Sequence, residues 1–247
     1  MSDDLRTMKT FSRAYWREAA SQLKSIRMLA VAAMIVALRV AVKFLEIPLA
    51  AGLKLSFDCY VNAVGSLIYG PVAALCVGAV SDTVGYIVKP TGAYFFPFIF
   101  VEMMSGFIFA LFFWRKPLTT GRSLAAKFSV NFVCNIVMTS VFVKWQCYLL
   151  YGIEEAAAYN LINLVRIAKS LVLFPLEAAL ILLLLEALTP LLARLKLISP
   201  ESIPAEELDR KKLLRGTVLA LLCSIALILF YIFFLKDFLS AHNIKLL

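Results

Sequence analysis

The hydrophobic positions of this 247-residue chain gather in seven long apolar stretches, separated by short polar connections. Several stretches approach the roughly 20 apolar residues that cross a bilayer core as a helix. The pattern therefore predicts an all-α integral membrane protein. The predicted segments are 28–45, 56–70, 72–88, 94–114, 125–150, 160–193 and 214–236.

The second and third segments are separated only by Gly70 and Pro71, a pair that predicts a tight turn rather than a loop. Composition agrees with a membrane protein, because 62% of the residues are hydrophobic. Soluble domains carry about 45–50%.

The net charge of +9 comes from cations in the connections between segments, so it does not indicate a nucleic-acid partner. Residues 1–27, 115–127 and 194–215 are rich in Lys and Arg and fall on one side of the predicted topology. Cytoplasmic loops carry such an excess. We expect a multi-pass protein of the cell membrane with a cytoplasmic N-terminus.

Five regions follow from this reading. They are a cytoplasmic amphipathic leader (1–27), a six-helix membrane domain (28–193), a cytoplasmic linker (194–213), an additional transmembrane helix (214–236) and a short tail (237–247). Apolar residues at helical spacing in the leader predict a helix that lies on the inner leaflet or docks on a partner protein.

Charged residues inside the apolar segments need an explanation, because burying a charge at membrane depth is costly. Arg39 lies deep in the first segment, and Lys43, one turn later, can extend its amine outward. Asp82, Lys89 and Glu102 surround an aromatic turn. One interpretation is a structural ion pair, Asp82–Lys89 or Glu102–Arg39. The other is an outward-facing pocket for a flat, polar, anionic ligand.

Two further patterns leave alternatives open. Ala33, Ala37 and Ala41 form a small-residue stripe that lets helix backbones approach closely, within the chain or against a partner. Asn131 and Asn135 share a helix face and can hydrogen-bond between helices.

Catalytic and metal chemistry is not indicated. The single histidine is His242, and the five cysteines are scattered without metal-type spacing. No P-loop, Ser-centred elbow or HExxH motif is present, so we expect no enzyme activity, no cofactor and no ATP hydrolysis by this chain.

Residues 15–193 resemble the substrate-binding subunits (S components) of energy-coupling-factor (ECF) vitamin transporters, and among them the folate family. The resemblance lies in "AAMIVAL" (32–38), "LKLSF" (53–57), the long stretch from "YGP" to "FALF" (69–112), "KFSVNFVCNIVMTSVFVKW" (127–145) and "RIAKSLVLFPLEA" (166–178). This chain departs from the family pattern at Ser170, where folate-type members commonly carry Asn.

The resemblance implies a six-helix subunit, here with one extra helix, that captures a folate-like vitamin outside the cell. It implies docking through Ala33, Ala37 and Ala41 onto a transmembrane scaffold with two ATPase subunits. The expected ligand-contacting residues are Arg39, Asp82, Tyr86, Lys89, Tyr94, Phe95, Phe96, Glu102, Asn135, Trp145 and Arg166.

In this hypothesis Arg39, Lys89 and Arg166 face the ligand's carboxylates, and Asp82 or Glu102 pairs with the pterin edge. Tyr94, Phe95, Phe96 and Trp145 wall the pocket. The alternatives are an S component for another vitamin and an ion-coupled secondary transporter that uses Asp82 and Glu102 as proton sites. An intramembrane enzyme is least favoured, because its motifs are missing.

Overall fold

The computed structural model describes residues 12–50, 53–90, 92–153 and 164–198, together with a few positions between 218 and 230. Most of the predicted seventh segment, the tail 237–247 and the first eleven residues of the leader lie outside the described residues.

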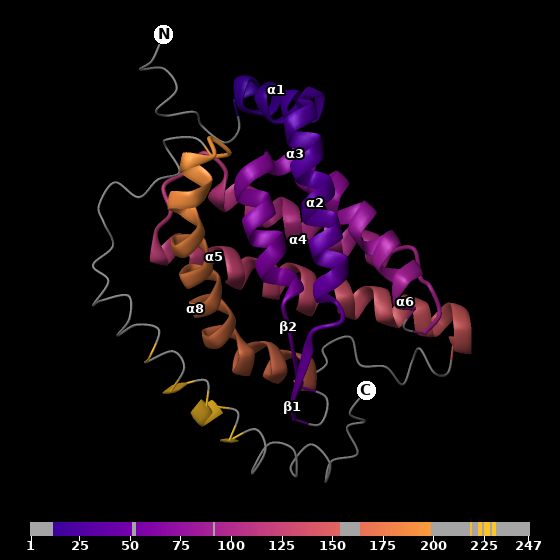
Figure 1. Ribbon diagram of the computed structural model, residues 1–247. Coiled ribbons are helices and arrows are strands. Elements are labelled where there is room, and N and C mark those ends of the chain that lie inside the picture. Colours follow the sequence, from indigo (N-terminus) through magenta and orange to yellow (C-terminus); the bar gives the residue numbers. More distant parts are fainter. Residues whose placement is uncertain are drawn as a thin grey trace.

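The described chain is mostly helical, which confirms the predicted all-α membrane class (Figure 1). In chain order the elements are α1 (Arg13–Ser21), η2 (Gln22–Lys24), α2 (Ile26–Val42), β1 (Glu46–Ala50), β2 (Leu53–Ser56), α3 (Asp58–Val88), α4 (Phe98–Phe113), α5 (Thr120–Val130), η3 (Asn131–Met138), α6 (Thr139–Tyr151) and α8 (Leu164–Arg194). The two short strands were not predicted.

Three of these stretches are long and apolar enough to cross a membrane: Asp58–Val88, Thr120–Tyr151 and Arg166–Arg194. A fourth passes the same test if α1, η2 and α2 are counted together, although a 79° bend separates them. The apolar helix α4 is shorter, at Phe98–Phe113.

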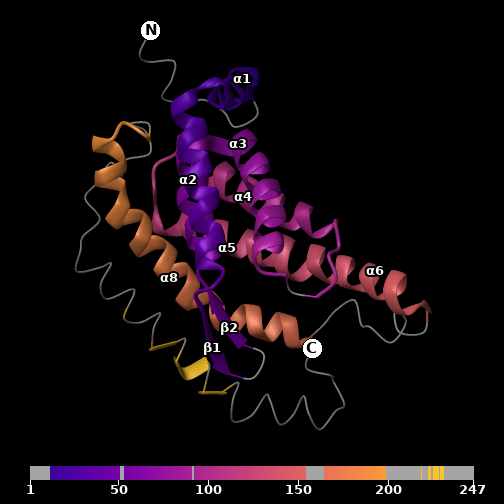
Figure 2. The same ribbon diagram turned by 45° about the vertical axis from the view of Figure 1, so that its right-hand side comes forward.

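The bend before α2 has a local cause, because each helix has its own serine cap. Ser12 accepts a hydrogen bond from the Tyr15 amide at 3.2 Å, and Ser25 accepts one from the Met28 amide at 3.5 Å. Ser residues at this position favour a new helix start. As a result α1 turns away from α2 at one end of the bundle (Figure 2).

The leader helix α1 packs on the chain's own bundle. Tyr15 and Ala19 are buried with Trp114, and the Tyr15 and Trp114 rings lie 4.9 Å apart edge to face. Glu18 forms an ion pair with Arg115. The apolar stripe of the leader is therefore used, at least over α1, to close this end of the bundle.

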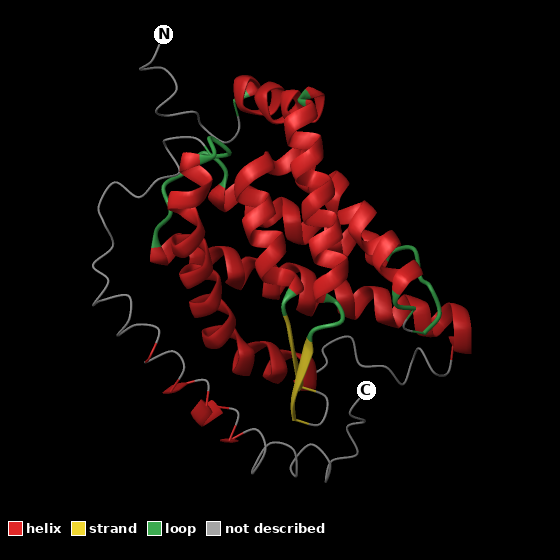
Figure 3. Ribbon diagram, viewed as in Figure 1, coloured by secondary structure: helices red, strands yellow, loops and turns green. Residues whose placement is uncertain are grey.

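At the opposite end of α2 the chain forms a two-stranded antiparallel hairpin (Figure 3). Its register pairs Glu46 with Ser56 at the open end of the hairpin. This pairing holds both residues beside the end of α2 and the start of α3.

Helix α3 contains the second and third predicted segments, and the break between them falls at Gly70. Gly70 has φ 79° and ψ 180°, a conformation that residues with a side chain rarely adopt. It also lies against the Trp114 ring, because a Cβ at this position would be 2.7 Å from Trp114 Cε2. The Gly-Pro turn thus locks the two halves of α3 onto the aromatic cluster below α1.

Close backbone contact joins α3 to α4. A Cβ on Gly78 would lie 2.8 Å from the backbone oxygen of Glu102, so only glycine fits there. Ser66 donates a hydrogen bond to the Gly106 carbonyl at 3.0 Å. These two contacts fix the position of Glu102 along α3.

A second polar contact joins α5 to α8. Lys127 and Glu177 form an ion pair at 2.9 Å, with the two side chains 2% and 13% exposed. The Asn131 amide donates to the Ser170 carbonyl at 3.4 Å, and Asn135 donates to Asn131 at 3.1 Å. The two asparagines therefore connect α8 to η3, a stretch of π-helix.

Replacing Gly70 by Ala is expected to destabilise the protein. The new Cβ would meet the Trp114 ring and hold φ in a strained region, costing about 2 kcal/mol. We expect the Tm of the purified protein in detergent to fall by roughly 4–8 °C. Gly121→Ala is the matched control, since a Cβ there meets nothing within 4 Å. Equal Tm values for the two variants would contradict the assigned role of Gly70.

Candidate functional site

A charged cavity of about 260 Å³ lies where the end of α2, the hairpin, the end of α3 and α4 meet. Four carboxylates from three elements and two lysines dominate its wall. The lining residues are Lys43, Glu46, Ser56, Asp58, Asp82, Gly85, Tyr86, Lys89 and Glu102.

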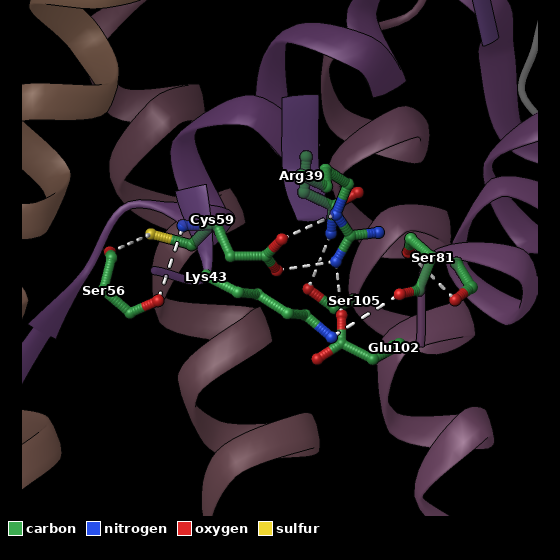
Figure 4. Close-up of polar contacts among 10 residues, drawn as sticks. Arg39, Lys43, Ser56, Cys59, Ser81, Glu102 and Ser105 are labelled. Carbon is green, nitrogen blue, oxygen red and sulfur yellow. Dashed lines mark hydrogen bonds and ion pairs between the residues drawn. The ribbon is translucent and has the colours of Figure 1, made fainter. Parts of the chain in front are cut away.

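Behind this wall, Arg39 is fully buried and bound by two carboxylates (Figure 4). Its Nε donates to Asp58 Oδ1 at 2.9 Å, and its Nη2 donates to Asp58 Oδ2 at 2.6 Å. Nη2 also donates to Glu102 Oε2 at 2.5 Å. One guanidinium on α2 thus joins the first turn of α3 to α4.

This arrangement decides between the two interpretations of Arg39. Its guanidinium is engaged by the protein, so the Glu102–Arg39 structural ion pair is present and Asp58 is an additional partner. A buried charge that loses one of its partners is strongly destabilising. Two carboxylates share a single cation, so this cluster presents a net negative charge to the cavity.

Lys89 is also engaged by the protein. Its amine donates to the backbone carbonyl of Lys43 at 2.6 Å and to Glu46 Oε1 at 3.1 Å, and it lies 5.7 Å from the centre of the Phe44 ring. A cation at a helix C-terminus stabilises the unpaired carbonyls there. Lys89 therefore ties the end of α3 to the end of α2 and to β1. The alternative Asp82–Lys89 pair is not formed.

Lys43 occupies a different position from the outward one that the sequence suggested. Its side chain lies over Gly85, where a Cβ would be only 2.3 Å from Lys43 Nζ. The amine is 3.5 Å from the Ser81 carbonyl. Lys43 therefore points along α3 and lines the cavity beside Asp82.

The predicted aromatic residues gather at the turn after α3, next to the cavity. Tyr86, which lines it, donates to the Gly92 carbonyl at 2.9 Å and packs on Tyr94 at 4.7 Å. Phe95 contacts Trp145 of α6, ring to ring, at 5.6 Å. Phe96 contacts Phe100 at 5.9 Å and is largely exposed.

The structure brings four predicted ligand residues together on the cavity wall: Asp82, Tyr86, Lys89 and Glu102. Arg39 supports two lining carboxylates from behind. The other six predicted residues do not line this cavity; they are Tyr94, Phe95, Phe96, Asn135, Trp145 and Arg166. Asn135 is bonded to Asn131, and Arg166 lies half-buried near the start of α8.

Sequence reasoning missed five lining residues: Lys43, Glu46, Ser56, Asp58 and Gly85. Two signals were available. A cation as deep as Arg39 requires a carboxylate partner, and Asp58 is the nearest acidic residue in the following segment. Gly85 lies one turn after Ser81 and three residues after Asp82, on the same face of α3.

The alanine stripe lies on the opposite side of α2 from this cavity. Ala33, Ala37 and Ala41 are exposed, with Met34 and Leu38 beside them, whereas Ile35 and Arg39 are buried. The described chain does not use the stripe for internal packing.

No group of three or more His, Cys, Asp or Glu side chains in the described part of the chain is arranged to hold a metal ion. The cavity offers carboxylate oxygens, lysine amines, a hydroxyl and one aromatic ring. These groups bind a polar ligand by hydrogen bonds and charge.

A family model described as "ECF-type riboflavin transporter, S component" matches residues 23–190, more than half of the chain. The chain belongs to this family. ECF S components are membrane-embedded subunits of transporters, so this protein is a multi-pass membrane protein and not an enzyme.

Curated relatives of this S component carry folate in their names. The "Folate transporter FolT" of Clostridium novyi is 26% identical over 129 residues, which are 52% of this chain and 70% of the relative. The protein of the same name from Leuconostoc mesenteroides is 25% identical over 126 residues, 51% of this chain and 66% of the relative.

The S component also resembles a solved structure described as "Crystal structure of FolT bound with folic acid". The TM-score is 0.52 and the identity is 26%, over 62% of this chain and 88% of the other. The fold of the membrane domain is therefore that of a FolT-like S component.

Removing one partner of Arg39 is expected to destabilise the S component unequally. Asp58→Asn weakens two hydrogen bonds to a fully buried guanidinium and should lower the free energy of unfolding by about 3 kcal/mol or more. Glu102→Gln weakens one hydrogen bond to the same guanidinium and should lower the free energy of unfolding by less. The measurement is thermal unfolding of each purified variant.

Glu46→Gln is the control for this series, because the Glu46–Lys89 pair is about one-third exposed at both ends. It should cost at most about 1 kcal/mol. A larger loss for Glu102→Gln than for Asp58→Asn would contradict the account of Arg39.

Proposed function

We propose that this S component binds folate or a related pterin and delivers it to an ECF-type importer. The names of the relatives and the folic acid in the similar solved structure support this ligand, although the family description names riboflavin. The observation that carries the proposal is the excess of carboxylates around the cavity. Asp82 and Glu102 line it together with Asp58 and Glu46.

These acceptors favour a pterin over a flavin. The pyrimidine edge of a pterin carries a carbonyl, a ring N–H and an amino group, whereas that of riboflavin carries a carbonyl on each side of its N–H. Carboxylates accept hydrogen bonds and repel carbonyl oxygens. An acid-rich wall therefore suits the ring with more donors.

The proposed roles of the predicted residues follow from their positions. Asp82 and Glu102 contact the ring edge, and Tyr86 forms part of the wall. Arg39 and Lys89 hold the wall in place. An aromatic rim, over which the aminobenzoyl part of folate can lie, consists of Tyr94, Phe95, Phe96 and Trp145. The glutamate tail would contact Asn135 and Arg166.

The orientation and partners are also part of this proposal. The distribution of Lys and Arg supports a cytoplasmic N-terminus, so the hairpin end with its cavity would face outside. The exposed face with Ala33, Ala37 and Ala41 would dock on a transmembrane scaffold subunit. Two ATPase subunits would supply the energy, since this chain has no nucleotide-binding motif that we recognise.

Uptake of labelled folate into proteoliposomes tests this function. We expect the chain alone to bind folate but not accumulate it, and accumulation to require the scaffold, the ATPases and ATP. Folate accumulation by the chain alone, driven by a proton gradient, would instead identify a secondary transporter that uses Asp82 and Glu102.

Ala33→Trp tests the docking face, since it places a large ring on an exposed stripe of small residues. We expect folate affinity to stay within about twofold, while co-purification with the scaffold and uptake fall at least about tenfold. Leu171→Trp, at an exposed position of α8, is the matched control and should leave both unchanged. Full uptake by Ala33→Trp would show that α2 does not dock through this stripe.

A further inference from the structure

Two charged groups of the cavity wall remain unused by the ion pairs described above. They are Lys43, directly after the end of α2, and Asp82 on α3, and both line the cavity. We propose that Lys43 and Asp82 together read the pyrimidine edge of the bound ring, and that Gly85 is the residue that makes this pairing possible. This inference rests on the proposed pterin ligand and assigns its recognition to named atoms.

Lys43 keeps donors for a ligand. Its one hydrogen bond to the described chain is the long one, 3.5 Å, to the Ser81 carbonyl. No carboxylate of the described residues lies within ion-pair distance of its amine. An ammonium group has three donors, so at least two point to other partners.

The position of Lys43 depends on Gly85. A Cβ at residue 85 would be 2.3 Å from Nζ, 2.9 Å from Cε and 3.0 Å from Cδ of Lys43. The last part of the lysine chain therefore lies in a groove that exists only because residue 85 has no side chain. Any larger residue there must move the amine from this position.

Asp82 keeps acceptors for a ligand. Among the described residues it takes part in none of the hydrogen bonds or ion pairs that hold Asp58, Glu46 and Glu102. Glu102 uses only Oε2 toward Arg39, which leaves Oε1 as a further acceptor. Acceptors and one cationic donor thus lie on the same cavity wall.

This set of groups matches the edge of a 2-amino-4-oxopteridine. Lys43 donates to the carbonyl oxygen at position 4, while Asp82 accepts from the ring N–H at position 3 and from the amino group at position 2. A volume of about 260 Å³ is below the roughly 300–1,000 Å³ of pockets for drug-sized ligands. The cavity therefore suits the bicyclic ring, with the rest of folate outside it.

The proposal predicts how the site discriminates at position 2. Lumazine has a carbonyl oxygen there instead of the amino group of pterin, so the carboxylate oxygen that faces position 2 loses its donor and is repelled. We expect the wild-type protein to bind pterin at least about tenfold more tightly than lumazine. Fluorescence quenching of each ring by the purified protein measures this preference directly, without folate.

Asp82→Asn is the decisive variant, because an amide can donate to the carbonyl of lumazine as well as accept. We expect pterin to bind about 10- to 100-fold more weakly and the preference for pterin over lumazine to disappear or reverse. Thr83→Ala is the matched control, since Thr83 is exposed and bonds only within α3, to the Ala79 carbonyl. It should keep the wild-type preference.

Lys43→Met and Gly85→Ala test the other half of the pair. Both variants should weaken the binding of pterin and of lumazine about equally, by roughly tenfold, because the carbonyl at position 4 is common to both rings. Gly85→Ala should behave as Lys43→Met even though Lys43 is intact. Adding Gly85→Ala to Lys43→Met should then weaken ring binding little further, since there is no amine left to displace.

An unchanged pterin preference in Asp82→Asn would overturn the assignment of the 2-amino group. Failure of both pterin and lumazine to displace bound folate, even at millimolar concentration, would place the ring outside this cavity and overturn the whole inference. The proposed folate function would survive that result. Conversely, a protein that discriminates the two rings but binds no folate would support the inference and refute folate as the ligand, which leaves a smaller pterin.

Discussion

The buried guanidinium of Arg39 is the interaction on which the rest of the site depends. It joins α2 to the first turn of α3 through Asp58 and to α4 through Glu102. A single charge at this depth is tolerated only because carboxylates surround it. Those carboxylates also line the cavity, so the same contacts that hold three helices together give the cavity its acidic character.

Helix α2 consequently has two different faces. One carries Arg39 and Lys43 toward the cavity, and the other exposes Ala33 and Ala37. In the proposed function, ligand and scaffold would contact opposite sides of one helix. A ligand that changes the packing of α2 on α3 would thereby change the surface offered to the scaffold, and binding energy at the two sites would be coupled reciprocally.

Part of this architecture could be predicted from the sequence, and physical reasons explain which part. Long apolar runs must be helical in a membrane, so the class follows directly. The pair Gly70-Pro71 predicted a tight turn, and the structure has a break in α3 at that position. The cost of buried charge singled out Arg39 and Glu102, which indeed form an ion pair.

The missed features depend on contacts between distant parts of the chain. The depth of Arg39 makes Asp58 a candidate partner, but acidic residues are common in a first helical turn, and the fold is needed to show that Asp58 faces Arg39. Lys89 binds a backbone carbonyl of another helix, which no pattern of side chains encodes. Gly85 resembles any small residue of a membrane helix until Lys43 is placed against it.

Calorimetric titration of the purified chain with folate and, separately, with riboflavin tests the central claim most directly. The claim is that an acid-rich cavity organised by Arg39 selects a donor-rich pterin. We expect one-to-one binding of folate and at least about a hundredfold weaker binding of riboflavin. Tight binding of riboflavin with weak or no binding of folate would contradict it.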